Sequence, residues 1–383
     1  MDFSLTDDQT AIRDLAYQIF TDRATDEFLL EFSRTEATYD DALWQTLAEQ
    51  GLLGIAVPES ADGTGLGIIE LCLILEEQGR RVAPIPLFSS LVLGGLPIAE
   101  FGSEHLQSSY LQPLVAGRMK LSAAIAESGM NPALASSVHA TPDGDDWLLS
   151  GSRSVIPDGG VADAVLVPAV DADGATSVFL VDCAADGVSR SPVEFGLSGE
   201  RAANLVLDQV RVPGDHLLGQ IGQGEEILEW LLQRANVAQC AMQVGVTDEA
   251  TKRTAAYVSE RKQFGIPLGS FQALAMRMAD SYIDVEGIRS MYWLAVWRLS
   301  EGLDARAEVR AAKWWACDAA HRVVSTSQHL HGGMGADVEY PIHRFFLLAK
   351  QISYSLGNAS QQLEELGSLL AEDDSLGFRA LEV

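Results

Sequence analysis

The residues best suited to chemistry lie in two short glycine-containing segments of the C-terminal half of the sequence. The first reads Arg261-Lys-Gln-Phe264-Gly, and the second reads His329-Leu-His-Gly332-Gly333. Arg261 carries a permanently charged guanidinium whose donors match a phosphate group bidentately. Gly332 and Gly333 have no side chains, so a phosphate or a ribose can approach their backbone amides closely. The two segments therefore indicate a site for a phosphate-bearing ligand.

Each of these residues has a simpler explanation when it is considered alone. Arg261 follows Glu260 and suits an exposed helix end, and paired glycines suit the end of a helix. Phe264 suits core packing, Gln272 a polar surface position and His329 a packing histidine. Taken singly, each residue is better explained in this way.

Long helices must position both segments. From Gly224 onward the sequence contains few helix breakers, and apolar residues recur at helical spacing. This spacing predicts helices over residues 225–260, 271–300, 305–328, 342–355 and 363–370. The first segment then follows the first of these helices, and the second segment lies between the third and the fourth.

Residues 1–120 also predict helices, but with interruptions. Apolar periodicity predicts helices over 5–20, 41–49 and 70–80, with Thr6 as the N-terminal cap of the first. Residues 57–67 are rich in Pro and Gly, which break regular structure. That stretch is either a loop that faces a ligand or a plain connection between helices.

Residues 121–223 have a different texture. Short apolar runs alternate with turns rich in Gly, Asp, Pro and Asn, which is typical of a small antiparallel β-domain. The runs predict strands over residues 121–126, 147–150, 164–169, 177–181 and 203–212.

This order of elements and these motifs resemble the acyl-CoA dehydrogenase family. The stretch from Arg261 to Gln272, the run His329–Gly335 and Tyr340-Pro341 fall at the spacing of that family, and residues 151–163 resemble its β-domain signature. The resemblance covers nearly the whole chain. It implies a mainly α fold with a central β domain: an N-terminal helical domain over 1–120, a middle antiparallel β-barrel-like domain over 121–223, and a C-terminal four-helix bundle over 224–383.

The resemblance also implies a cofactor and a reaction. Members of the family form dimers or dimers of dimers and bind FAD across a subunit interface, with the ADP half reaching the neighbouring subunit. They dehydrogenate an acyl-CoA thioester: a carboxylate base takes the α-proton, and the flavin takes the β-hydride. Carried over by position, the residues implied to bind the cofactor are Arg261, Phe264, Gln272, His329, Gly332 and Gly333. The family usually has Gln where this chain has His329.

The flavin-ring side departs from the family pattern. Ala126 stands where the family has a Thr hydroxyl, and Asn131-Pro-Ala stands in place of a Gly-Ser-Asp element. Val155-Ile-Pro157 replaces a Trp-Ile-Thr or Trp-Ile-Ser sequence. The aromatic wall is therefore missing, and proline offers no backbone N–H at its position. These differences indicate either ordinary drift in a working pocket or real loss of the flavin site, and two losses in one pocket favour the second.

The catalytic base is missing as well. Most family members place Glu before a Gly where this chain has Leu356, and a minority place it at the position of Ala235. Neither side chain can accept a proton, although enolisation of a thioester needs a positioned base. Glu229 and Glu249 lie on the same long predicted helix as Ala235, but too far along its axis, and suit solvated helix faces. Glu127 matches a family residue without this role.

This pattern of presence and loss predicts a subunit that completes the ADP half of a partner's FAD site without a base of its own. It resembles the glutamate-lacking subunits of heterotetrameric (α2β2) sterol side-chain acyl-CoA dehydrogenases. The expected partners are a homologous glutamate-bearing subunit, an acyl-CoA substrate such as a steroid side-chain thioester, and electron-transfer flavoprotein or a similar acceptor. Two alternatives are a self-sufficient homo-oligomeric flavin oxidase or monooxygenase, and a non-catalytic member that binds acyl-CoA or a partner protein.

Composition limits the remaining classes of function. The 383 residues carry a formal net charge of −28, which disfavours nucleic acid and anionic membranes as partners. The four cysteines are far apart and form no CxxC pair, which is typical of reduced thiols in a cytoplasmic protein. The N-terminus has no basic segment followed by an apolar run, and no apolar stretch reaches the length of a membrane span.

Overall fold

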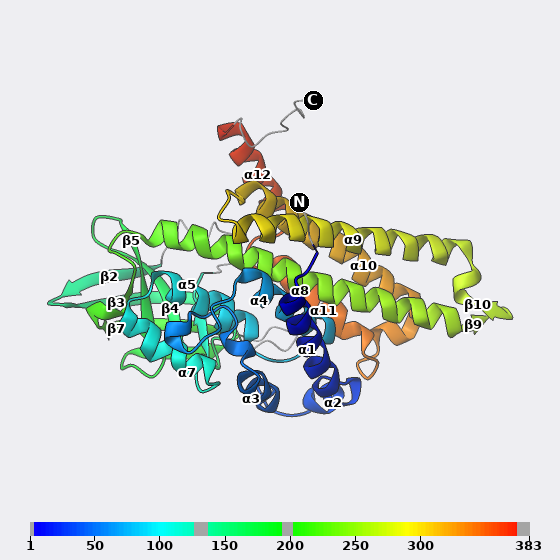
Figure 1. Ribbon diagram of the computed structural model, residues 1–383, viewed down its shortest axis with the longest axis horizontal. Coiled ribbons are helices and arrows are strands. Elements are labelled where there is room, and N and C mark those ends of the chain that lie inside the picture. The colour runs from blue at the N-terminus through cyan, green and yellow to red at the C-terminus, as the bar shows by residue number, and fades with distance from the viewer. Residues whose placement is uncertain (1–3, 126–136, 194–201, 374–383) are drawn as a thin grey trace. The chain divides into compact units, whose positions relative to one another are not determined.

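The computed structural model describes residues 4–125, 137–193 and 202–373 (Figure 1). The chain divides into two compact units. The first, called the helical unit, comprises Met1–Arg34, Cys72–Ala83 and Asn236–Val383. The second, called the sheet unit, comprises Thr35–Leu71 and Pro84–Ala235. The domain boundaries predicted after residues 120 and 223 stay a prediction.

The described α-helices are α1 (Asp7–Arg23), α2 (Asp26–Phe32), α3 (Asp41–Glu49), α4 (Ile68–Arg81), α5 (Leu96–Phe101), α6 (Glu104–Leu106), α7 (Gln112–Val115), α8 (Gly224–Glu260), α9 (Gln272–Ser300), α10 (Arg306–Leu330), α11 (Ile342–Tyr354) and α12 (Ala359–Glu372). The 3₁₀ and π turns are η1 (Leu52–Gly54), η2 (Glu59–Ala61), η3 (Phe88–Gly95), η4 (Gln107–Leu111), η5 (Gly214–His216), η6 (Leu268–Ser270) and η7 (Gly332–Ala336). None of the described helices is both long enough and apolar enough to cross a membrane.

The described strands are β1 (Leu121–Ala123), β2 (Val138–Asp143), β3 (Asp146–Ile156), β4 (Ala164–Val170), β5 (Thr176–Asp182), β6 (Val188–Pro192), β7 (Ala203–Val212), β8 (Leu217–Leu218), β9 (Lys262–Gln263) and β10 (Ile266–Pro267). Strands β1 to β8 form one sheet, in which the order is β6-β7-β3-β2-β4-β5-β8 and β1 pairs with β4. Most neighbours are antiparallel, as predicted, but β1 and β2 pair with β4 in parallel. Strand β3 intervenes in the sequence, and parallel neighbours need such a long connection.

Local sequence explains where the helices begin. The Thr6 hydroxyl accepts a hydrogen bond from the Gln9 backbone N–H at 3.2 Å, and the Gln9 side chain accepts one from the Thr6 N–H at 3.0 Å. This reciprocal pair satisfies two of the free N–H groups at the start of α1, which confirms the predicted cap. The predicted helix over 41–49 coincides with α3, and the long helix predicted over 225–260 is α8.

Two glycines let α4 and α8 touch at their backbones inside the helical unit. A Cβ atom on Gly79 would lie 2.2 Å from the Met242 carbonyl oxygen, and one on Gly245 would lie 1.9 Å from the Glu76 carbonyl oxygen. Beside this contact, Arg80 of α4 forms ion pairs with Glu76, Glu77 and, across to α8, Asp248. This packing fixes the middle of α8 closely against α4.

The sheet unit has its own apolar core. Its buried residues come from β2, β3, β4, β5 and β7. They include Val138, Leu149, Val165, Val167, Phe179, Leu205, Leu207 and Val210. The four cysteines are free and buried, in agreement with the prediction of reduced thiols.

Candidate functional site

The first predicted segment forms a short hairpin at the end of α8. The Arg261 N–H still bonds to the Tyr257 carbonyl, and β9 then pairs antiparallel with β10. The two residues of the turn, Phe264 and Gly265, have φ values of +56° and +85°. A two-residue hairpin turn with positive φ at both positions matches the right-handed twist of its strands. The hairpin was not predicted as such, because strands of two residues leave no alternating pattern to detect.

Phe264 is both strained and exposed. A left-handed backbone costs a residue with a side chain about 1–2 kcal/mol. The ring is nevertheless 93% exposed, and its one aromatic neighbour among the described residues is Phe271, edge-on at a centroid distance of 6.3 Å. The explanation of Phe264 as a core residue is therefore wrong. Arg261 is also exposed, and its guanidinium makes no ion pair with any residue that the structure describes.

The second predicted segment follows α10 directly. Gly332 has a φ of +62°, and a Cβ atom on either Gly332 or Gly333 would meet nothing within 4 Å. Gly335 differs, because its Cβ would lie 2.2 Å from the Gln328 carbonyl oxygen, so packing requires that glycine. Packing does not require Gly333, and its backbone is open to an approaching ligand. The helix-end explanation fits Gly332, which adopts the left-handed conformation typical of helix ends.

His331 connects the two segments. Its ring is buried and stacks on Tyr257 of α8 at 4.4 Å, and it lies 5.3 Å from the ring of Tyr340. Its Nδ1 bonds to the Ser327 carbonyl at 2.7 Å. Burial lowers the pKa of His331, and the bond to Ser327 opposes this shift. Because Tyr257 lies one turn before Arg261, the stack places Gly332 and Gly333 at the same end of the helical unit as the hairpin.

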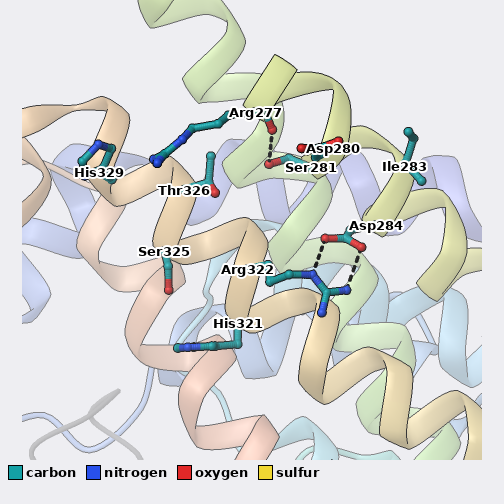
Figure 2. A pocket seen from close by; sticks show the side chains of 10 residues that line it. All are labelled: Arg277, Asp280, Ser281, Ile283, Asp284, His321, Arg322, Ser325, Thr326 and His329. Atoms are coloured by element: carbon teal, nitrogen blue, oxygen red, sulfur yellow. Dashed lines mark hydrogen bonds and ion pairs between the residues drawn. The ribbon is translucent and has the colours of Figure 1, made fainter. Parts of the chain in front are cut away.

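His329 lines a pocket between α9 and α10, shown in Figure 2. The pocket has a volume of about 660 Å³ and is lined by Arg277, Asp280, Ser281, Ile283, Asp284, His321, Arg322, Ser325, Thr326 and His329. Arg277 extends from α9 toward Thr326 and His329 on α10 (Figure 2). Gln272, five residues before Arg277, is exposed at the first position of α9. His329 is exposed here, so the explanation of it as a packing residue is wrong.

The two arginines of this pocket differ in their partners. Arg322 donates to both oxygens of Asp284, at 2.9 and 2.8 Å, and pairs with Asp318 (Figure 2). These carboxylates raise its pKa. Arg277 forms no ion pair with the described residues, so its charge is available to a ligand. Sequence reasoning missed Arg277, because a single arginine in an amphipathic helix gives no signal of its own.

The positions of the family base hold buried apolar residues. Leu356 is 6% exposed and has a φ of +56°, and its carbonyl accepts a hydrogen bond from the Gln362 side chain at 3.1 Å. Ala235 is fully buried.

Glu249 pairs with Arg253 at 2.8 Å and with Arg81 at 3.7 Å, with its side chain 14% exposed. The interpretation of Glu249 as a solvated helix face is therefore wrong; it belongs to a largely buried ion-pair cluster. Glu229 is half-buried and accepts a hydrogen bond from Gln233.

The flavin-ring side is described only in part. Val155 has a φ of +57° within a bulge of β3, and its N–H donates to the Asn204 side chain. Pro157 is buried, and its carbonyl accepts a hydrogen bond from the Ser122 hydroxyl at 2.6 Å. The sequence interpretations that concern Ala126, Glu127 and Asn131 fall on residues outside the described ranges.

Comparisons with known proteins place both helical regions in one family. The models of the acyl-CoA dehydrogenase N-terminal domain and C-terminal domain match residues 6–118 and 222–368. Acyl-CoA dehydrogenase FadE27 of Mycobacterium tuberculosis is 36% identical over 97% of this chain and 99% of its own length.

Two solved structures are also similar over nearly the whole chain. A Tcur3481-Tcur3483 steroid ACAD variant shares 44% identity with a TM-score of 0.89, covering 96% of this chain and 99% of that one. The ChsE4-ChsE5 complex from Mycobacterium tuberculosis shares 35% identity with a TM-score of 0.90, covering 97% and 100%.

Proposed function

The chain belongs to the acyl-CoA dehydrogenase family, whose cofactor is FAD, and we propose that it is a subunit that completes a partner's FAD site without supplying a catalytic base. It would bind the ADP half of the cofactor, while a homologous subunit contributes a glutamate and the flavin-ring pocket. The active enzyme is then a heteromer of the two chains.

The chemistry of the donor set fits an adenosine diphosphate group. Arg261 offers a free guanidinium for the pyrophosphate, and the open backbone of Gly333 lets a phosphate or ribose approach. His329 and Gln272 offer polar groups for the nucleoside, and Arg277 adds a second unpaired positive charge beside His329. In a chain of net charge −28, such local cations are needed for any anionic ligand.

The observation that carries the proposal is Phe264. Its conformation costs free energy and its ring is 93% exposed, so nothing within the described chain repays either cost. A contact with a group outside the chain would bury the ring and offset the free energy of the strained backbone. An aromatic ring at the tip of a hairpin, beside a free arginine, is suited to cover the adenosine of a cofactor held mainly by another subunit.

The base positions support the division of roles. When bound, FAD supplies the acceptor for the substrate hydride, but removal of the α-proton needs a group that Leu356 and Ala235 cannot provide. Val155 does not provide the aromatic wall of the family, and Pro157 has no backbone N–H to donate to the flavin. This chain's part in the reaction is therefore to bind and orient.

The substrate class rests on similarity. The steroid ACAD variant and the ChsE4-ChsE5 complex are both similar to this chain over nearly its full length, and each is named for two components. By this similarity the enzyme acts on a bulky acyl-CoA such as a steroid side-chain thioester. Electron-transfer flavoprotein is the expected acceptor of the electrons.

Flavin content tests the proposal. The chain is purified alone and also after co-expression with a glutamate-bearing homologue from the same genome, and bound FAD is measured by visible absorbance. Alone, the chain should be nearly colourless or unstable. The co-expressed complex should hold about one FAD per two chains, as expected if only the glutamate-bearing chain supplies a flavin-ring pocket.

The opposite results identify the alternatives. One tightly bound FAD per chain in the isolated protein would overturn the proposal in favour of a self-sufficient oxidase or monooxygenase. A stable, colourless protein that forms no complex and binds acyl-CoA would instead identify a non-catalytic member of the family.

A further inference from the structure

Two histidines and an aspartate meet in the sheet unit, in residues that the proposed function does not use. His105 lies on α6, and Asp215 and His216 lie on η5. One ligand atom from each of the three lies within 4.8 Å of the other two. His105 Nε2 and Asp215 Oδ2 are 3.6 Å apart. His105 lies more than 100 positions before the adjacent Asp215 and His216, so no local motif could reveal the three together.

The ring of His216 is held with one nitrogen committed. Its Nδ1 lies 3.1 Å from the Leu180 carbonyl oxygen. A carbonyl only accepts hydrogen bonds, so Nδ1 carries a proton, and in the neutral ring the lone pair is on Nε2. The ring also packs edge-on against Tyr110 at a centroid distance of 5.6 Å. A histidine that donates one N–H to a backbone carbonyl and presents the other nitrogen is the arrangement in which histidines bind metals.

The spacing suits a small tetrahedral ion. Ligand atoms about 2.0–2.1 Å from a zinc ion lie roughly 3.3 Å from one another. The pair His105 and Asp215 is already close to this separation, and their side chains are 57% and 59% exposed, so both can move by the small remaining amount. We propose that His105, Asp215 and His216 bind a divalent transition ion of the zinc type, with water in the fourth position.

The ligand chemistry selects the ion. Two imidazoles and one carboxylate favour Zn²⁺, Co²⁺ or Ni²⁺, whereas Mg²⁺ and Ca²⁺ prefer oxygen ligands throughout. The ion would join α6 to η5, and through η5 to the end of β7 within the same unit. Because a folded site binds an ion more tightly than the unfolded chain, occupancy should stabilise the sheet unit.

Metal titration of the untagged full chain tests the site, and it requires no flavin or partner. Zn²⁺ binding is measured by calorimetry, and Co²⁺ binding by its visible absorption, for the wild type and for His105→Ala, His216→Ala and His139→Ala. His139 is an exposed histidine on β2 and serves as the control. We expect about one ion per wild-type chain, tetrahedral Co²⁺ bands, and a rise in Tm with Zn²⁺ but not with Mg²⁺.

The variants decide the outcome. His105→Ala and His216→Ala should each weaken Zn²⁺ binding by at least about tenfold and remove the rise in Tm, while His139→Ala should change neither. His105 is exposed, so its variant tests the site even if His216→Ala fails to fold. Equal Zn²⁺ affinity in all four proteins, or no binding at stoichiometric concentration, would overturn the proposal. Neither result would bear on the FAD site.

Discussion

Phe264, at the tip of the β9–β10 hairpin, and Leu356, at the position of the family's base, share a strained backbone conformation but differ in burial. Phe264 and Leu356 both have a φ of +56°, which residues with side chains rarely adopt. Leu356 is 6% exposed, whereas Phe264 is 93% exposed. Burial of the Leu356 side chain within the chain offsets the strain at that residue. No contact among the described residues offsets the strain at Phe264, which agrees with the proposal that its ring contacts a group outside the chain.

The charged groups repeat this contrast. Arg80, Arg253 and Arg322 are each bound to carboxylates of their own chain. Arg261 and Arg277 have no such partner among the described residues. Two cations free to bind a ligand therefore lie in the α8–α9 hairpin and in the pocket lined by α9 and α10. The two positions at which the family carries its base hold Leu356 and Ala235. This arrangement agrees with the proposed division of cofactor binding and base catalysis between two subunits.

The largest expected effect comes from placing a carboxylate at Ala235, one of the two positions at which the family carries its base. Ala235→Glu would place a carboxylate where the native side chain is fully buried, and an unpaired buried charge typically costs about 3–5 kcal/mol. We expect the variant to unfold at much lower urea concentration than the wild type and to show no dehydrogenase activity alone. Ala235→Leu controls for size. A stable Ala235→Glu protein that dehydrogenates acyl-CoA without a partner would show that this side lacks only the base.

The next effect concerns the cofactor. In the complex with a glutamate-bearing subunit, Arg261→Ala should weaken FAD binding about 10- to 100-fold, because a charge-assisted pair of hydrogen bonds to phosphate is lost. Arg261→Lys should recover only part of the affinity, since it cannot bind bidentately. Equilibrium dialysis of FAD measures the loss, and Arg13→Ala, at an exposed arginine of α1, is the control. Unchanged affinity in Arg261→Ala would remove the hairpin from the cofactor site.

A smaller effect of opposite sign is expected in the isolated chain. Phe264→Gly relieves the left-handed strain, so it should raise the free energy of unfolding by about 1 kcal/mol. The same change should weaken FAD binding in the complex. Met276→Ala, at an exposed apolar residue of α9 without this strain, should not stabilise the chain. Urea denaturation compares the three proteins; a destabilised Phe264→Gly chain would mean that the ring packs within its own subunit.

Several elements could be predicted closely because their signals are local. The helix over 41–49 and the strand over 203–212 were predicted to the residue, since caps, periodicity and turn residues act within a few positions. The parallel pairings of β4 were missed because pairing partners far apart in sequence leave no local pattern. Strands β9 and β10 were missed because each has only two residues.

The site could be predicted only where a motif marks it. Arg261, Phe264 and the glycines occur at a recognisable spacing, but their exposure, which carries the functional argument, depends on tertiary structure. Arg277 joins His329 only because α9 lies beside α10 in the pocket. The roles of these residues toward FAD, including those of Gln272 and Gly332, stay predictions until the complex is measured.

The smallest expected effect concerns His331, whose ring connects the second glycine-containing segment to Tyr257 of α8. Burial lowers the pKa of His331 below its ordinary value of 6.5, so the folded chain binds this proton less readily than the unfolded chain. Stability from this residue is therefore fully present above pH 6.5 and is lost as the pH falls through the lowered value. The slope of unfolding free energy against pH is below the limit for one proton, about 1.4 kcal/mol per pH unit.

Urea denaturation between pH 7.5 and 5.5 measures that slope. His331→Phe keeps a ring between Tyr257 and Tyr340 but cannot be protonated, so its slope should be shallower than that of the wild type. His139→Gln should leave the slope unchanged, because that side chain is exposed in the native state. Equal slopes in all three proteins would mean that folding leaves the pKa of His331 near its ordinary value of 6.5. Protonation of the stacked ring below that pH would then add a positive charge behind Gly332 and Gly333.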